Sequence, residues 1–294
     1  MAASVVYIFA AQSVRWLISV YFLAAVHYTN VAHGDRINGP GCGISAPIGR
    51  IVNGEKVDRL QVPWIVYLEI KYMDRTNRRV KVKCGGSIIS PSFILTAAHC
   101  LYRKRREPLG AIIYYNETRR KQGPRRRAEL FIRHPSFNNP ANDIGLIKLR
   151  RPIPFDSFVH AVCLPIRNFN LARRHSLVAG WGRIAESGRS SDDLLYITRE
   201  VLPFELCKAT FNRPSLLRKL HRGNVICTSS VSKDSCKGDS GGPLTTWLHG
   251  VRSVQVGIVS FGVGCARPDK PGVYTRVSAF VPWIKWQIAI NYDL

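Results

Sequence analysis

Apolar residues in this chain occur mostly as short runs separated by turn residues. Runs of this length, bounded by Gly, Pro, Asn or Ser, are typical of strands rather than of helices. No internal repeat or low-complexity tract interrupts the pattern. The sequence therefore predicts an all-β protein, and five of its runs are Trp64–Ile70, Ser87–Leu95, Ile144–Leu149, Leu177–Trp181 and Gln255–Phe261.

The last part of the chain shows a different pattern. Residues Ala279–Ile290 place Trp283, Ile284 and Ile288 at helical spacing, and Pro282 falls where the first turn of a helix tolerates proline. We expect a C-terminal helix whose apolar side packs on the body of the protein. Docking of a partner on this helix is the alternative.

The N-terminus is apolar as well. Arg15 interrupts the apolar start of the chain, and Trp16–Val26 then forms an uncharged run of 11 residues. This length fits a signal peptide and is shorter than the roughly 20 residues of a spanning helix. We expect residues 1–34 to be a signal peptide, with a membrane anchor as the alternative, and residues 35–50 to be a short, linker-like pro-segment.

Composition narrows the class further. The chain has 294 residues, 46% of them hydrophobic, which is enough for a large packed core. Eight cysteines in an exported protein indicate an oxidising compartment and disulfide bonds. No Cys-x-x-Cys pair is present, so we expect no metal site and no cofactor.

One segment carries the clearest chemical signal, Gly238-Asp239-Ser240-Gly241-Gly242-Pro243. A serine between glycines in a tight turn is exposed to a substrate, and glycine lets a carbonyl group approach the backbone closely. The N–H groups of Gly238 and Ser240 would then point at one spot, as the stabilisation of an oxyanion requires. Glycine-flanked serines also occur in ordinary loops.

Two further segments supply partners for this serine. His99 follows an apolar run in Thr96-Ala97-Ala98-His99-Cys100, and Asp143 precedes another in Asn142-Asp143-Ile144-Gly145. A serine hydroxyl needs a base within hydrogen-bond reach and a third group that orients the base. His99, Asp143 and Ser240 fit these roles in the order His, Asp, Ser. Each residue alone would more often be a structural polar group.

These segments resemble those of the chymotrypsin/trypsin family of serine endopeptidases, in order and spacing, over residues 51–294. Three more segments carry the resemblance: Arg50-Ile51-Val52-Asn53-Gly54, Ala179-Gly180-Trp181-Gly182 and Lys270-Pro271-Gly272-Val273-Tyr274. The resemblance implies two six-stranded antiparallel β-barrels with the site between them. It also implies that Ser240 is the nucleophile, His99 the general base and Asp143 the group that orients it, with Gly238 and Ser240 as the oxyanion hole.

The same resemblance implies how the cysteines pair. The implied disulfides are Cys84–Cys100, Cys207–Cys227, Cys236–Cys265 and Cys42–Cys163, the last of which would join the pro-segment to the protease domain.

Activation and specificity follow from the resemblance too. Cleavage of Arg50-Ile51 would free an amino group on Ile51 that pairs with Asp239. Asp234, six residues before the nucleophile, would lie at the base of the primary pocket and favour Arg or Lys. The other implied substrate-binding residues are Ser235, Ser260, Gly262 and Gly272.

The net charge of +24 comes largely from clusters of arginine and lysine. We expect either an exosite for acidic proteins or sulfated glycans, or a generally basic secreted protein with solvated charges. The loop that binds Ca²⁺ in some relatives is basic here, so no calcium site is expected. The clusters are Lys71–Lys83, Arg103–Arg106, Arg119–Lys121, Arg125–Arg127 and Arg213–Arg222.

Three hypotheses follow. The leading one is a secreted, monomeric, trypsin-like endopeptidase zymogen that carries a glycan at Asn116 of Asn116-Glu117-Thr118 and cleaves proteins after Arg or Lys, activated by another protease or by itself. The second is a weakly active homologue whose basic surface binds acidic proteins or glycans. The third is a membrane-anchored protease. No motif for reading nucleic acid is present.

Overall fold

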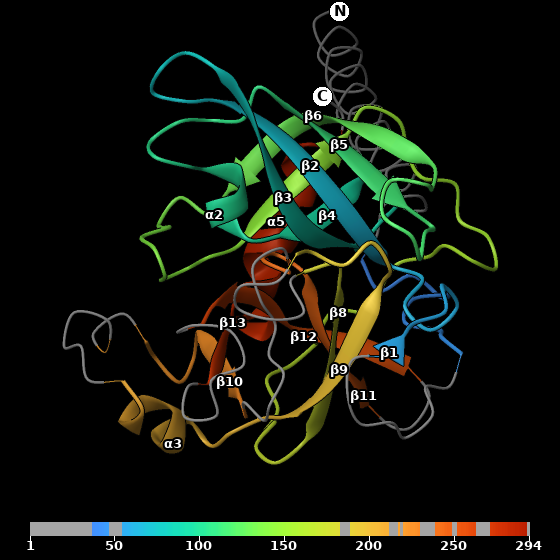
Figure 1. The fold of residues 1–294 in the computed structure, drawn as a ribbon. Helices are drawn as coiled ribbons and strands as arrows, with labels where there is room; N and C mark the ends of the chain where they lie inside the picture. The colour runs from blue at the N-terminus through green and yellow to red at the C-terminus, as the bar shows by residue number, and fades with distance from the viewer. Residues whose placement is uncertain are drawn as a thin grey trace, which may run out of the picture. The chain divides into compact units, whose positions relative to one another are not determined.

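The computed structural model describes residues 37–46, 55–182, 189–211, 217, 220–229, 239–248, 252–262 and 271–292. These residues all belong to one unit, Ile37–Leu294. Most of its regular structure lies in two antiparallel sheets, labelled in Figure 1.

The first sheet is a closed barrel with the strand order β2-β3-β4-β7-β6-β5. Strand β2 pairs with both β3 and β5, and this second pairing closes the barrel. Because no strand edge is left open, every strand is paired on both sides. The strands are β2 (Ile65–Met73), β3 (Arg79–Ile88), β4 (Phe93–Thr96), β5 (Gly110–Tyr115), β6 (Arg125–Arg133) and β7 (Gly145–Leu149).

The second sheet contains six strands in the order β9-β8-β11-β12-β13-β10, and the short strand β1 joins it beside β9. A bridge between Val201 and Thr228 links the end of β9 back to β10, which closes this sheet into a second barrel. The expected pair of six-stranded barrels is confirmed. The strands are β1 (Glu55–Lys56), β8 (His175–Gly180), β9 (Leu195–Glu200), β10 (Val225–Thr228), β11 (Pro243–Leu248), β12 (Arg252–Phe261) and β13 (Gly272–Arg276).

Four of the five apolar runs correspond to single strands, and one does not. Residues Ser87–Leu95 contain the end of β3 and the start of β4. A tight turn separates the two strands, in which the N–H of Ile89 donates to the carbonyl of Phe93 at 3.1 Å and the N–H of Phe93 donates to Ser90 Oγ at 3.1 Å. All the residues of this turn except Pro91 are buried, so the apolar pattern does not mark it.

The helices are short, apart from the C-terminal α5 (Val281–Ile290), which confirms the predicted helix. Pro282 lies in its first turn, and Val281, Ile284 and Ile288 join the same buried cluster as the interior of the first barrel. The other helices within the described ranges are α2 (Ala98–Leu101), α3 (Phe204–Ala209) and the 3-10 turn η1 (Val277–Ala279). Within the described ranges, no helix is both long and apolar enough to span a membrane.

Residues 37–46 are attached to the second barrel rather than loose. Cys42 forms a disulfide with Cys163, and the carbonyl of Gly43 accepts the N–H of Ser253 at 2.9 Å. The side-chain amide of Asn38 donates to the carbonyl of Leu164 at 2.9 Å and accepts the N–H of Leu164 at 2.6 Å. The expected linker character does not apply to this stretch, because its polar groups are paired with the body of the protein.

Candidate active site

The register of two strands brings His99 and Asp143 together. Strands β4 and β7 are antiparallel, and Thr96 at the end of β4 pairs with Gly145 at the start of β7. The chain therefore leaves β4 and enters β7 at the same edge of the barrel. His99, three residues after Thr96, and Asp143, two residues before Gly145, become neighbours there. His99 Nδ1 accordingly lies 2.7 Å from Asp143 Oδ2.

The carboxylate of Asp143 is fully buried and accepts three hydrogen bonds. The backbone N–H of His99 donates to Oδ1 at 2.8 Å, while His99 Nδ1 and Ser260 Oγ donate to Oδ2 at 2.7 and 2.5 Å. The hydroxyl of Thr275 also donates to the Asp143 carbonyl at 2.8 Å. Because a buried carboxylate is costly unless it is hydrogen-bonded, these donors hold both Asp143 and the His99 ring in one orientation.

This arrangement sets the protonation of His99. Since Nδ1–H donates to Asp143, the neutral ring leaves Nε2 as its basic nitrogen. Burial of the ring opposes protonation, but the adjacent Asp143 carboxylate outweighs burial and raises the pKa of His99 above its ordinary value of 6.5. A quarter of the His99 side chain remains exposed, so the ring is open to solvent on one side.

The turn that carries Ser240 lies beside the same edge of the first barrel. The Ser240 carbonyl accepts the N–H of Gly85 at 2.8 Å, and the N–H of Gly241 donates to the carbonyl of Val259 at 2.8 Å. Gly241 has a φ of +81°, and a Cβ built on it would lie 2.2 Å from Thr96 Oγ1. Only glycine fits there. The turn thus contacts the strand end three residues before His99.

Asp239, directly before Ser240, is buried against the Gly180-Trp181-Gly182 segment. Its Oδ1 accepts the N–H of Gly182 at 2.8 Å. A Cβ on Gly180 would lie 2.1 Å from Oδ1, and a Cβ on Gly182 would lie 2.2 Å from Oδ2. The two glycines are therefore required because the Asp239 carboxylate fills the space that their side chains would take.

The resemblance implied a substrate-binding role for Ser260, and the structure adds a hydrogen bond from its side chain to Asp143. Strand β12 shifts its register against β13 between Val259 and Phe261, so Ser260 lies at a bulge. A bulge redirects a side chain, and here the Ser260 hydroxyl reaches Asp143. Thr275, also missed, is the neighbouring donor to Asp143 on β13. No local sequence signal marks either residue.

The substrate-binding residues are described only in part. Gly262 follows the end of β12 and is exposed, while Gly272 begins β13 and is buried. A Cβ on Gly272 would lie 3.2 Å from the ring and hydroxyl of Tyr274. Other residues of the site lie outside the described ranges and stay predictions: Arg50, Ile51, Asp234, Ser235, Cys236, Gly238 and Cys265.

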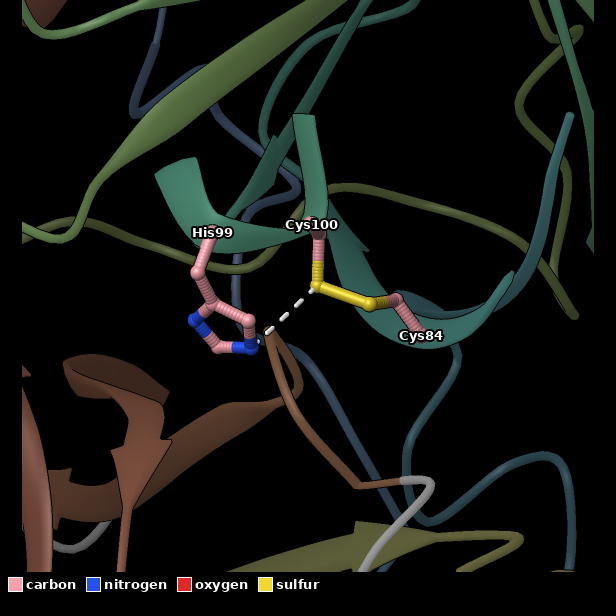
Figure 2. Close-up of side chains that lie close together, drawn as sticks. All are labelled: Cys84, His99 and Cys100. Atoms are coloured by element: carbon pink, nitrogen blue, oxygen red, sulfur yellow. Dashed lines mark hydrogen bonds between the residues drawn. A yellow bond between two sulfur atoms is a disulfide. The ribbon is translucent and has the colours of Figure 1, made fainter. Parts of the chain in front are cut away.

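Cys84, His99 and Cys100 offer three potential metal ligands within 4.8 Å of one another. Figure 2 shows that the two sulfur atoms are joined in a disulfide, with His99 Nε2 lying 3.7 Å from Cys100 Sγ. A disulfide offers no thiolate, which is the form of cysteine that binds metal. The group therefore lacks the donors of a metal centre. The third described bridge joins Cys207 to Cys227.

Two buried carboxylates lie among the basic segments, Glu69 on β2 and Glu117 in the loop after β5. Glu69 pairs with Lys81 at 2.9 Å and with Lys121. Glu117 accepts the N–H of Gly123 at 2.8 Å. Asn116, the predicted glycan site, lies in this loop with a φ of +51°, and its buried Oδ1 has no hydrogen-bond partner among the described residues. Glycosylation at Asn116 stays a prediction.

Two closed antiparallel barrels, with a buried Asp–His pair at the edge of one and a serine turn beside it, define a class of serine hydrolases. A family model described as Trypsin matches residues 51–284. The chain is 35% identical over 256 residues to Venom serine protease Bi-VSP of Bombus ignitus, covering 82% of this chain and 69% of that protein. It is 34% identical over 246 residues to Trypsin of Squalus acanthias, covering 82% of this chain and 96% of that protein.

A third relative is the Suppressor of tumorigenicity 14 protein homolog of Bos taurus, which is 32% identical over 255 residues. This alignment covers 82% of the chain but only 28% of that longer protein. The chain belongs to the trypsin family and is a serine protease, which confirms the resemblance seen in its motifs.

The raised pKa of His99 predicts the pH dependence of hydrolysis. His99 must lose its proton to act as a base, so kcat/KM should fall as the pH drops through an apparent pKa above 6.5. In Asp143→Asn this limb should move to lower pH, and kcat should fall about 10⁴-fold, the loss this family shows when the triad carboxylate becomes an amide. A pH–rate profile measures both. Asp193→Asn, which alters an exposed carboxylate, serves as the control, and an unmoved limb in Asp143→Asn would contradict the assignment.

The contact between Gly182 and Asp239 predicts a second result. In Gly182→Ala the new methyl group should displace the Asp239 carboxylate and, with it, the Ser240 turn. We expect kcat to fall by about 10²-fold, a loss that a shift of about 1 Å can cause. Steady-state kinetics test this, with thermal unfolding as the check on folding. Gly41→Ala is the matched control, because a Cβ there meets nothing within 4 Å. Equal activity in the two variants would show that the contact is unimportant.

Proposed function

We propose that this serine protease is a secreted endopeptidase that cleaves after Arg or Lys and is made as a zymogen activated at Arg50-Ile51. The observation that carries the catalytic part is the buried Asp143 carboxylate, which holds His99 at 2.7 Å beside the Ser240 turn.

In the proposed reaction, Ser240 Oγ attacks the carbonyl carbon of the scissile peptide while His99 Nε2 takes the hydroxyl proton. The carbonyl π electrons move to the oxygen, which accepts hydrogen bonds from the N–H groups of Gly238 and Ser240. His99 then gives its proton to the leaving amine as the C–N bond breaks. Water enters, transfers a proton to His99 and hydrolyses the acyl-serine by the same steps. Asp143 stays ionised and stabilises the imidazolium form throughout.

Specificity for Arg or Lys rests on Asp234. A carboxylate at the end of a narrow slot would pair with a guanidinium or ammonium group and would be left unpaired by an aromatic side chain. Gly272, one of the implied pocket residues, is buried, and a Cβ there would lie 3.2 Å from Tyr274, so glycine fits this position best.

Activation rests on Asp239. Its position against Gly180 and Gly182 leaves the carboxylate buried directly beside the nucleophile. In the proposal, the new ammonium group of Ile51 pairs with this carboxylate and fixes the turn that orients the oxyanion hole. The Cys42–Cys163 disulfide would keep the pro-segment attached after the cut. Three disulfides among the described residues fit an exported protein.

The basic surface favours a second function, the binding of an acidic partner. Arg125 and Arg127 on β6 are exposed, as are most of Arg103–Arg106 after α2. Acidic proteins or sulfated glycans are the partners that such charges would attract. We rank this binding below catalysis as a candidate function, because all three triad residues are present in the chain.

Arg50→Gln should produce a chain with nearly no activity. Without a cut after residue 50, no ammonium group forms on Ile51, and the oxyanion hole should stay unformed. The measurement compares hydrolysis of an Arg peptide amide by the purified pro-form before and after treatment with an Arg-specific protease. Wild type should gain activity on treatment, whereas Arg50→Gln and Ser240→Ala should not. Full activity of untreated Arg50→Gln would refute the zymogen mechanism.

Asp234→Ser should change specificity without removing catalysis. We expect kcat/KM for Arg and Lys substrates to fall by about 10²-fold or more, since a charge-assisted hydrogen bond is lost. Hydrolysis of a Phe substrate should be unchanged or higher. Wild type and variant are compared on three peptide amides that differ only in Arg, Lys or Phe before the cut. A wild-type preference for Phe would overturn the Asp234 assignment.

A further inference from the structure

A second pocket lies in the second barrel, and none of its lining residues belongs to the catalytic or specificity residues named above. Its volume is about 600 Å³, within the range of sites that hold small organic molecules. The walls come from residues 168–172, residues 201–205, the 222–227 segment that leads into β10, and Arg276 at the end of β13. Arg276 is four residues along β13 from Gly272, or roughly 13 Å at the rise of a strand.

Two arginines line this pocket, Arg222 and Arg276. The exposed Glu205 is the one carboxylate among the described lining residues, and it forms no ion pair with either arginine within the described part of the chain. Burial lowers the pKa of Arg276, and the like charge of Arg222 lowers it further. Among the described lining residues, the site therefore carries an excess of positive charge.

The guanidinium of Arg276 has an unused donor. Its Nε–H is buried and has no hydrogen-bond partner among the described residues. Its Nη1 makes a long contact of 3.4 Å with Asn168 Oδ1, which also accepts the Ser278 hydroxyl at 3.2 Å. Arg276 and Arg222 both line the pocket, and an anion inside it would offer acceptor oxygens to their guanidinium groups.

Part of the wall is apolar. Phe169, Leu171, Leu202 and Phe204 line the pocket, together with Val225 and Ile226 of β10. An inorganic ion would leave most of these surfaces uncovered. A ligand that matches both parts of the site has an anionic group and an apolar body.

We propose that this pocket binds a small organic anion, whose acidic group pairs with Arg276 and Arg222 and whose apolar body lies against Phe169, Leu202 and Phe204. A carboxylate and a sulfonate present the same pair of acceptor oxygens to a guanidinium group. This site is separate from the catalytic centre, and its occupation does not depend on the proposed specificity or activation.

The test is a fluorescence titration of the full chain with 8-anilino-1-naphthalenesulfonate. The neutral N-phenyl-1-naphthylamine has the same two aromatic groups and no charge, so it is the matched probe. We expect one site for the anionic probe, and binding weakened at least about tenfold by Arg276→Gln, the loss expected for a charged hydrogen bond. Arg222→Gln should weaken it less. Binding of the neutral probe should be weak and unchanged in both variants.

Two further variants keep the result clear if Arg276→Gln fails to fold. Gly223 lines the pocket, and a Cβ there meets nothing within 4 Å, so Gly223→Leu should fold and should block both probes. Arg75→Gln, on the exposed turn after β2, is the control for charge and should bind like wild type. Thermal unfolding and hydrolysis of a peptide amide confirm that each variant is native.

Competition identifies the acidic group. Displacement of the probe by 2-naphthoate or by 2-naphthalenesulfonate shows whether a carboxylate or a sulfonate is preferred, and inorganic sulfate at the same concentration should displace little. The proposal is overturned if Arg222→Gln, Arg276→Gln and Gly223→Leu all bind the anionic probe as wild type does. It is also overturned if the neutral probe binds equally well, or if inorganic sulfate competes as strongly as the naphthyl anions.

Discussion

The active site depends on one buried charge, the carboxylate of Asp143. It has no contact with solvent, and a carboxylate placed there without partners would cost several kcal/mol, on the order of a protein's whole margin of stability. Three donors around the carboxylate offset this cost, and they come from α2 and from β12, with Thr275 of β13 holding the Asp143 backbone. The same hydrogen bonds that make the charge tolerable also fix the His99 ring. Stability and catalytic geometry are therefore set by the same contacts.

Close backbone contact between the two barrels is the second requirement. The Ser240 turn reaches the first barrel because Gly85 and Gly241 have no side chains, and Asp239 fits because Gly180 and Gly182 have none. The glycines of the motifs thus have a steric explanation that does not rely on family membership. Each removes a Cβ that would otherwise lie within about 3 Å of a neighbouring backbone or carboxylate.

Much of this was predictable from the sequence, and the reasons are local. Apolar runs between turn residues indicate strands, and Pro282 with the apolar residues after it indicates α5. The roles of Ser260 and Thr275 were not predictable, because they depend on a bulge and on hydrogen bonds to Asp143, which lies more than 100 positions away in the sequence. The turn inside Ser87–Leu95 was not predicted, because its residues are largely buried and its polar groups form hydrogen bonds within the turn. The pocket with Arg222 and Arg276 could not be found either, since its walls come from four separate segments.

The packing of α5 has a consequence for the order in which the protein becomes complete. Ile284 and Ile288 belong to the same buried cluster as Trp64 and Leu68, so α5 helps to bury apolar side chains of the barrel that is synthesised first. A nascent chain that has emerged only as far as β7 has every strand of that barrel but exposes the apolar surface that α5 later covers. Contacts so distant in sequence form slowly. We therefore expect the first barrel to reach its native packing only after α5 has been synthesised, and chains truncated before residue 281 to be prone to aggregation.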